Sequence, residues 1–245
     1  MKNYILIHGG WHGKWVFDKI APSLAKNPNT SVVALDLPGH FTNFGNYDFR
    51  DVNLKLYVDF VSDFITTNKL YHSYLVGHSM AGIVISQVGQ NIPEYIDKLI
   101  YLSAFIPSNN GSLVDEEKKA KFPSVALNIK IDKKNCSIII DKTKIKELFY
   151  HNCKEHDINF ALSHIQDQPL LPFIDKASLG DNFSKLHKVY IECLQDQAIH
   201  IEDQRRMNSI CDKIVSIDTD HSPFFSSCDE LVEILGNEHN QNDII

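Results

Sequence analysis

The sequence has no long hydrophobic run, which excludes a fold built on membrane-spanning helices. No stretch of its 245 residues approaches the roughly 18 uninterrupted apolar residues that a bilayer requires. The apolar run near the N-terminus is too short for the core of a signal peptide, and no small-residue cleavage site follows it. We therefore expect a cytoplasmic protein that does not act at a membrane.

Positive charge is also in short supply. The 24 Lys and Arg residues face 31 Asp and Glu residues, which gives a formal net charge of −7. Nucleic-acid binding usually requires a basic surface, and so does adhesion to anionic lipids. Both kinds of partner are therefore excluded from our expectations. The remaining composition, 43% hydrophobic and 22% charged, is typical of a globular protein with a substantial core.

Paired cysteines and the spacings of metal ligands are missing as well. The five cysteines are an odd number, and no two of them form a Cys-x-x-Cys pair, so we expect free thiols in a reducing compartment. His8 and His12 are four residues apart, but glycines lie between and beside them, so no stable helical face presents both. Because no His-Glu-x-x-His sequence occurs either, we expect no metal site.

What the sequence does contain is an alternation of apolar strand-like runs with segments of helical periodicity. The predicted strands cover residues 4–8, 31–37, 74–77, 98–104, 188–194 and 213–218. The predicted helices cover residues 14–26, 51–68, 79–91 and stretches near 202–210 and 223–236. Such alternation, with strands that are apolar throughout, indicates an α/β fold with a mostly parallel sheet flanked by helices on both faces.

The alternation lapses between about residues 107 and 186. This stretch carries several prolines, a β-like segment at 137–140 and helix-like pieces at 143–151 and 155–166. The simplest interpretation is a core made of residues 1–106 and 187–245, with residues 107–186 inserted as a cap.

The strongest local signal lies at the end of the third predicted strand. The segment Leu75-Val-Gly-His-Ser-Met-Ala-Gly82 runs from an apolar strand through a small-residue turn into a helix. This context predicts a nucleophile elbow, in which Ser79 occupies a strained turn with its hydroxyl above the sheet. The usual last glycine of the motif is Ala81 here, followed by Gly82. The alternative interpretation is a turn that only lets the strand and the helix pack closely.

The partners that a serine nucleophile needs follow in the expected chain order. An imidazole must accept the hydroxyl proton, and an acid must orient that imidazole. His221 follows the last predicted strand, and Asp196 follows the strand before it, so both lie at carboxyl ends of strands, where open α/β sheets place their sites. Asp218 and Asp220 are alternatives for the acid but are better explained as turn or capping residues, and we expect Asp203 on a helix surface.

An oxyanion hole requires two backbone N–H groups beside the nucleophile. Met80, directly after the serine, is the first candidate. Gly10, in the loop His8-Gly-Gly-Trp11 after the first strand, is the second. A plain turn is the alternative for this loop, and we expect His78, beside the nucleophile, to be structural.

Six segments carry a resemblance to a known family. They are Ile7-His-Gly-Gly-Trp-His-Gly-Lys-Trp15, Val33-Ala-Leu-Asp-Leu-Pro-Gly39, Gly77-His-Ser-Met-Ala-Gly82, Tyr101-Leu-Ser-Ala-Phe-Ile-Pro107, Val189-Tyr-Ile-Glu-Cys-Leu-Gln-Asp196 and Asp220-His221. The chain resembles the plant-type methylesterase and hydroxynitrile lyase family of α/β-hydrolases and its bacterial esterase relatives. The segments cover both core parts, and only the cap is poorly matched. The resemblance implies an α/β-hydrolase fold with an inserted cap.

The resemblance also implies a chemistry. It implies a serine hydrolase without a cofactor, whose triad is Ser79, Asp196 and His221. Hydroxynitrile lyases of this family carry a lysine directly after the catalytic histidine and a threonine in the first loop. Here Ser222 and Gly10 stand at those positions. Without a cation near the leaving group, cyanide release lacks electrostatic stabilisation, so the sequence favours an esterase.

We therefore predict a carboxylic ester hydrolase that acts through an acyl-enzyme on a small, mainly apolar ester, with methyl esters among the candidates. Trp11 and the cap residues Phe122, Phe149, Phe160 and Phe173 are candidates to line an apolar pocket, although cap aromatics as often only pack the cap onto the core. A lyase and a non-catalytic binding or receptor protein stay as alternatives. The expected partner is the small-molecule ester, and a homodimer stays an open alternative to a monomer.

Overall fold

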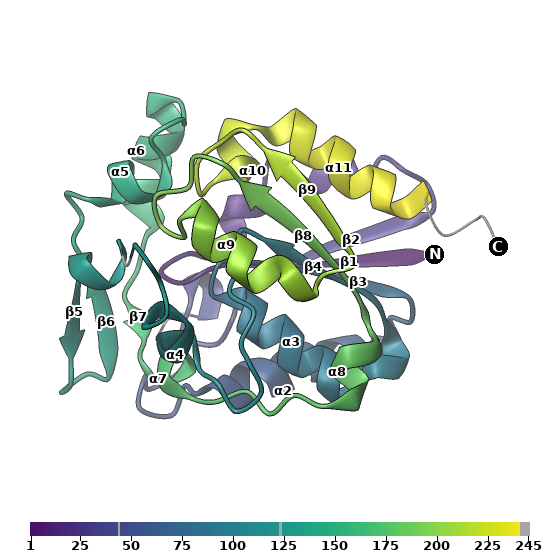
Figure 1. Ribbon diagram of the computed structural model, residues 1–245, viewed down its shortest axis with the longest axis horizontal. Helices are drawn as coiled ribbons and strands as arrows, with labels where there is room; N and C mark the ends of the chain where they lie inside the picture. The colour runs from purple at the N-terminus through teal and green to yellow at the C-terminus, as the bar shows by residue number, and fades with distance from the viewer. Residues whose placement is uncertain (44, 123, 241–245) are drawn as a thin grey trace.

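The computed structural model describes residues 1–43, 45–122 and 124–240. A six-stranded parallel sheet lies at the centre (Figure 1), and its strands run in the spatial order β2-β1-β3-β4-β8-β9. The strands are β1 (Lys2–Ile7), β2 (Thr30–Leu35), β3 (Ser73–His78), β4 (Ile96–Leu102), β8 (His187–Cys193) and β9 (Lys213–Ile217). All six predicted strands are confirmed, with their ends displaced by at most about two residues.

Helices cover both faces of this sheet, which is why its central strands are apolar throughout. On one face lie α2 (Leu54–Thr67), α3 (Ala81–Asn91) and α8 (Asp181–Lys185), and on the other lie α10 (Pro223–Ser226) and α11 (Cys228–Asn240) (Figure 1). In β3, every residue is buried. Asn53 begins α2 by accepting the backbone N–H of Leu56 at 2.8 Å, and the helix buries residues three and four apart.

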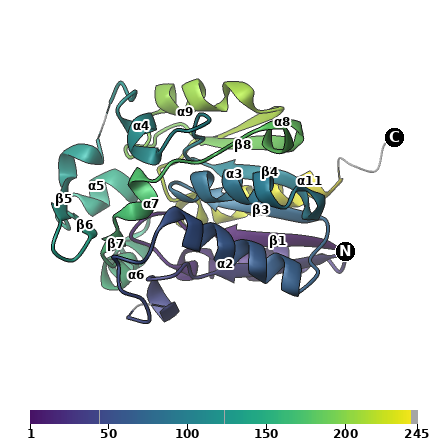
Figure 2. The ribbon, with the colours of Figure 1, turned by 90° about the horizontal axis from the view of Figure 1, so that it is seen from below.

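The chain between β4 and β8 adds no strand to the main sheet. It forms a smaller antiparallel sheet of β5 (Ile129–Asp132), β6 (Ser137–Ile140) and β7 (Gln168–Pro169). Its helices before α8 are α4 (Leu113–Glu117), α5 (Ile145–Phe149), α6 (Glu155–His164) and α7 (Leu171–Ile174). Both views place the small sheet at the end of the molecule where the central strands have their carboxyl ends (Figures 1 and 2). The last part of this segment returns to the core, because α8 packs against α3.

Two helix predictions are wrong in detail. Residues 14–26 form a 3-10 turn (Lys14–Phe17) and a short α1 (Ala21–Leu24) instead of one helix, and Pro22, which has no N–H to donate, lies in the first turn of α1. The predicted helix at 223–236 is divided into α10 and α11 at Ser227. The stretch near 202–210 is α9 (Ile201–Met207) followed by a 3-10 turn. No helix in the described ranges is both long and apolar enough to cross a bilayer.

Candidate active site

Ser79 occupies a strained turn between β3 and α3, at the carboxyl end of the central sheet. Its φ is +54°, in the left-handed region that non-glycine residues rarely adopt. The turn is held on both sides: the Ser79 N–H donates to the Leu102 carbonyl at 3.2 Å, and the Ser79 carbonyl accepts the Phe105 N–H at 3.0 Å. Neighbouring β4 therefore fixes the conformation that raises the serine hydroxyl above the sheet.

Small residues around this turn are required by contact distances. A Cβ on Gly77 would lie 2.9 Å from the Ala81 carbonyl oxygen, and a Cβ on Gly82 would lie 2.1 Å from the Phe105 carbonyl oxygen. A Cβ on Gly9 would lie 2.9 Å from the Cβ of Ser79 itself. Alanine is accommodated at position 81, because the close approach of strand and helix that demands glycine falls at position 82.

Asp196 and His221 lie in direct contact. The Nδ1–H of His221 donates to Oδ2 of Asp196 at 2.6 Å, and both side chains are almost fully buried. The same Asp196 oxygen accepts the hydroxyl of Ser103, and its other oxygen accepts the backbone N–H groups of Ala198 at 2.6 Å and Ile199 at 2.9 Å. Four donors thus fix the position of the carboxylate and, through it, the orientation of the His221 ring.

The other three aspartates that were considered for the acid have different partners. Asp220 accepts the backbone N–H of Ser222 at 3.0 Å, Asp218 accepts an amide from a glutamine side chain at 2.7 Å, and Asp203 accepts the backbone N–H of Lys121 at 3.2 Å. Asp203 is buried, at 5% exposure, and not on a helix surface as expected. Asp203 contacts the backbone of Lys121 in the inserted segment, and the periodicity of its own helix gave no sign of this contact.

Ser79 and His221 have neighbours in common, and no direct hydrogen bond joins their side chains among the described residues. The Phe149 ring, 5.4 Å from the His221 ring between centroids, lines the same cavity as Ser79. His78, next to Ser79 in the chain, packs 4.6 Å from the His221 ring, and its Nε2–H donates to the His221 carbonyl at 2.9 Å. This role for His78 is structural, as the sequence predicted. Catalytic hydrogen bonds are often long before a substrate is bound, so this geometry is compatible with a triad.

The loop after β1 contains a backbone donor without an acceptor. The Gly9 carbonyl accepts the Nδ1–H of His8 at 2.8 Å and the backbone N–H of His12 at 3.4 Å. Since a trans peptide directs its C=O and N–H to opposite sides, the Gly10 N–H is directed away from these two partners. Among the residues with described positions, neither the Gly10 N–H nor the Met80 N–H has a hydrogen-bond acceptor.

Two buried histidines fix this loop as neutral rings. Burial lowers the pKa of His8 to about 4 and that of His12 to about 3. His12 donates from Nδ1 to the Gly10 carbonyl at 2.5 Å, and its Nε2 accepts the Tyr150 hydroxyl at 2.5 Å. Sequence reasoning missed His12, Tyr150 and Ser103 as supporting residues. The His-Gly-Gly-Trp-His sequence was a signal for the first, whereas the other two contacts depend on the tertiary fold.

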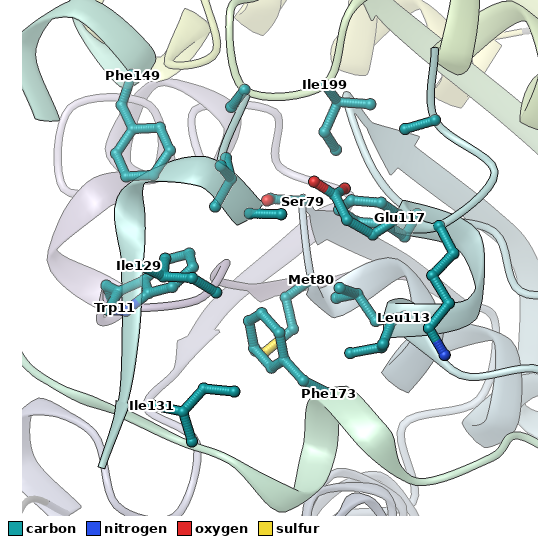
Figure 3. Close-up of a pocket in the computed structure, with 17 residues that line it drawn as sticks. Trp11, Ser79, Met80, Leu113, Glu117, Ile129, Ile131, Phe149, Phe173 and Ile199 are labelled. Atoms are coloured by element: carbon teal, nitrogen blue, oxygen red, sulfur yellow. The ribbon is translucent and has the colours of Figure 1, made fainter. Parts of the chain in front are cut away.

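A cavity of about 400 Å³ opens in front of Ser79, between the core and the inserted segment (Figure 3). Its walls are mostly aromatic and aliphatic. The lining residues are Trp11, Ser79, Met80, Phe105, Leu113, Val114, Glu117, Lys118, Ala120, Val125, Ala126, Ile129, Ile131, Phe149, Phe173, Ala198 and Ile199. Trp11, Phe149 and Phe173 were among the aromatic residues expected there. The arrangement combines an apolar binding space with a hydroxyl and unpaired backbone donors at its base.

The expectation is wrong for the other two aromatics, Phe122 and Phe160, which do not line this cavity. Phe122 packs against His200 at 4.2 Å between centroids, with the two rings tilted, and is 42% exposed. Phe160 packs against Trp15 at 5.6 Å and is 39% exposed. The expectation relied on residue type alone, and these rings join the cap to the outer surface of the core instead. Within the described ranges, no group of three or more His, Cys, Asp or Glu residues could hold a metal ion.

Comparison with known proteins gives consistent matches over nearly the whole chain. The family model described as the alpha/beta hydrolase family matches residues 4–234. The chain is 28% identical over 246 residues to a chloroplastic Arabidopsis thaliana protein provisionally named methylesterase 11, covering 95% of this chain and 63% of that protein. It is 26% identical over 260 residues to methylesterase 9 of the same plant, covering 96% and 98%. The chain thus spans less than two thirds of the first relative and nearly all of the second.

The fold also has close solved counterparts. A pyrethroid hydrolase from Sphingobium faniae JZ-2 superposes with a TM-score of 0.87 at 24% identity, over 98% of each chain. At this identity the likeness concerns the fold, and it covers the inserted segment as well as the sheet.

Proposed function

The chain belongs to the alpha/beta hydrolase family, and from this premise we propose that it hydrolyses carboxylic esters with Ser79 as the nucleophile. The observation that carries the proposal is the buried pair of Asp196 and His221, 2.6 Å apart, which shares one site with the strained Ser79 turn. Relatives named as methylesterases support ester chemistry over other reactions of the family.

The first half of the proposed reaction forms an acyl-enzyme. The Nδ1–H of His221 donates to Asp196, which leaves the Nε2 lone pair to accept the Ser79 proton as the serine oxygen attacks the ester carbonyl. The N–H groups of Gly10 and Met80 stabilise the negative charge that develops on the carbonyl oxygen. The C–O bond of the ester then breaks, and the alcohol leaves with the proton held on His221.

The second half regenerates the serine. Water enters after the alcohol leaves, His221 takes its proton, and the resulting oxygen nucleophile attacks the acyl carbonyl. Collapse of this intermediate releases the acid and returns the proton to Ser79. In both halves of the reaction, loss of one oxyanion donor costs roughly 100- to 1,000-fold in rate, so the rate depends on the loop that holds Gly10 in place.

The cavity favours a small ester with a mainly apolar body. Its volume of about 400 Å³ is within the usual range for small-molecule sites, and most of its lining side chains are hydrocarbon. A methyl ester is the preferred candidate, because the relatives carry methylesterase names.

Cyanide release by a lyase has less support. Ser222, the residue after the histidine, carries no charge, and Lys118 is the one cation among the residues that line the cavity. The Lys118 side chain is 71% exposed and its ammonium lies 3.6 Å from Asp115. A leaving cyanide would therefore meet no buried positive charge.

The proposal is tested by comparing the native chain with Ser79→Ala. Native protein is expected to turn over p-nitrophenyl acetate and to be labelled at Ser79 by a fluorophosphonate, and the variant is expected to do neither. Persistent turnover by Ser79→Ala would contradict the mechanism. Stoichiometric ester binding without turnover by the native chain would indicate a binding protein, and cyanide release from mandelonitrile would indicate a lyase.

A further inference from the structure

One carboxylate interrupts the apolar wall of the cavity. Glu117, at the C-terminal end of α4, lines the cavity together with Ser79, and Figure 3 shows its carboxylate pointing into the space that the apolar side chains enclose. Two other polar side chains of the lining, Lys118 and Trp11, are already committed. The Lys118 ammonium is directed to the surface, and the Trp11 indole N–H donates to the Ile138 carbonyl at 2.9 Å.

Glu117 differs from the two acidic residues that precede it in the chain. Asp115 accepts the backbone N–H of Ser112 at 3.1 Å in a capping box, and the buried Glu116 forms an ion pair with the exposed Arg206 at 2.8 Å. In contrast, Oε1 of Glu117 is buried and has no hydrogen-bond partner among the described residues. The fold therefore pairs two of the three neighbouring carboxylates and leaves one oxygen of the third, Glu117, without a partner among the described residues.

Among the described residues, no Lys, Arg or His forms an ion pair with Glu117. Burial raises the pKa of this carboxyl, and the negative charge of Asp203 raises it further, whereas the backbone N–H of Ala126 acts in the opposite direction. A buried carboxyl oxygen without a partner costs free energy that a packed apolar side chain of similar size would not. Perturbed ionisable groups inside a cleft are more frequent at functional sites than elsewhere.

We propose that Glu117 binds a protonated amine on the substrate, so that the preferred esters carry a basic nitrogen on an otherwise apolar body. This inference rests on the proposed ester hydrolysis. The ammonium group donates a hydrogen bond to the unpaired Oε1 of Glu117 and supplies a positive charge beside it. A charge-assisted hydrogen bond of this kind is stronger than a neutral one. Monoesters of dicarboxylic acids are disfavoured for the same reason, because their free carboxylate would face the carboxylate of Glu117.

Three methyl esters of equal size separate the interaction from hydrophobic binding. Methyl 4-(aminomethyl)benzoate carries the cation, methyl 4-(hydroxymethyl)benzoate a neutral donor, and methyl 4-ethylbenzoate neither. The native enzyme is expected to show its highest kcat/KM on the amine. Glu117→Gln keeps the size of the side chain and removes its charge. The ratio of kcat/KM for the amine-bearing ester to that for methyl 4-ethylbenzoate is therefore expected to fall roughly 10- to 100-fold.

A matched control removes the same charge elsewhere. Glu233 is exposed on α11, away from the cavity, and Glu233→Gln is expected to leave the ratio of the two kcat/KM values unchanged. If Glu117→Gln does not fold, as judged by its thermal unfolding, Glu117→Leu tests the same charge with an apolar side chain. Inhibition by benzylamine, compared with benzyl alcohol, gives a second readout that needs no turnover of an amine ester.

The outcomes distinguish this inference from the proposed function. An amine preference that survives in Glu117→Gln, or a hydroxymethyl ester that is hydrolysed as well as the amine, overturns the role of Glu117 as a cation site. If methyl 4-ethylbenzoate is hydrolysed in a Ser79-dependent manner while the amine-bearing ester is not preferred, the ester hydrolase stands and only the inference fails. If no ester is hydrolysed and Ser79 is not labelled, the proposed function itself fails.

Discussion

Replacement of Asp196 by asparagine tests the catalytic proposal at one atom. In the native protein, one oxygen of Asp196 accepts the N–H groups of Ala198 and Ile199, and the other accepts from Ser103 and from Nδ1–H of His221. Asparagine can keep its carbonyl oxygen on the two backbone donors. Its NH₂ group then faces His221 and can only donate, so the ring must carry its proton on Nε2.

An imidazole with its proton on Nε2 cannot accept the proton of the serine. The general effect of this exchange in serine hydrolases is a loss of about 10⁴ in kcat. At 1.36 kcal/mol for each tenfold change, this corresponds to about 5.4 kcal/mol of transition-state stabilisation. We expect this loss in Asp196→Asn, measured as kcat for p-nitrophenyl acetate at neutral pH, with a thermal unfolding curve close to that of the native chain.

Asp220→Asn is the matched control, because this neighbouring carboxylate binds the backbone of Ser222 and of Asn152 at 2.8 Å and does not contact the imidazole through any described hydrogen bond. It is expected to lower the unfolding temperature more than kcat. If Asp196→Asn keeps a tenth or more of the native kcat, or if Asp220→Asn is the variant that loses activity, the assignment of the orienting acid is refuted.

Three further variants test the support of the site. Gly82→Ala would place a methyl group 2.1 Å from the Phe105 carbonyl, so we expect a loss of about 3 kcal/mol or more in urea unfolding, and near-native stability would contradict the close approach. Tyr150→Phe leaves Nε2 of His12 without its hydrogen-bond donor, so we expect the free energy of unfolding to fall by about 1–3 kcal/mol and kcat to be lower. Unchanged stability and kcat would contradict a supporting role for this contact. Because burial raises the pKa of Glu117, the contribution of this carboxyl to the stability of the native fold falls as the pH rises above its ordinary value of 4.5, and Glu117→Gln lacks this contribution. The unfolding temperature of that variant relative to the native chain should therefore increase between pH 4 and pH 7, and a constant difference would be inconsistent with the buried ionisation.

The central sheet could be predicted because its information is local. A strand that is buried on both faces must be apolar throughout, and the strand-to-helix turn at Ser79 requires small residues at fixed positions. The predicted positions of Asp196 and His221 followed from the same logic, since parallel strands share one carboxyl edge. Helix breaks were harder to predict from the sequence. No proline or glycine marks the division at Ser227, which depends on how α10 and α11 pack.

The cap could not be predicted to the same extent, because its short elements are defined by contacts with the core. An aromatic residue type indicates burial but not direction, which is why Phe149 faces the cavity whereas Phe160 faces Trp15. Glu117 was likewise indistinguishable from a solvated charge in its mixed-sign segment. Only the fold shows that one carboxylate of this segment is turned inward and that its Oε1 has no hydrogen-bond partner among the described residues.

The inserted segment also holds the loop after β1, to which we assign one oxyanion donor, through contacts with Trp11. The Trp11 indole N–H donates to the Ile138 carbonyl at 2.9 Å, and the Trp11 backbone N–H donates to the side chain of Gln168 at 3.2 Å. The Trp11 carbonyl in turn accepts the backbone N–H of Gln166 at 3.0 Å. With the Trp11 N–H occupied by Gln168, the Gly10 N–H is left without an acceptor among the described residues. If Gly10 supplies the oxyanion donor, as we propose, these contacts hold the loop in the conformation that the donor needs, and Gln168→Ala is expected to lower kcat for p-nitrophenyl acetate although this side chain does not line the cavity.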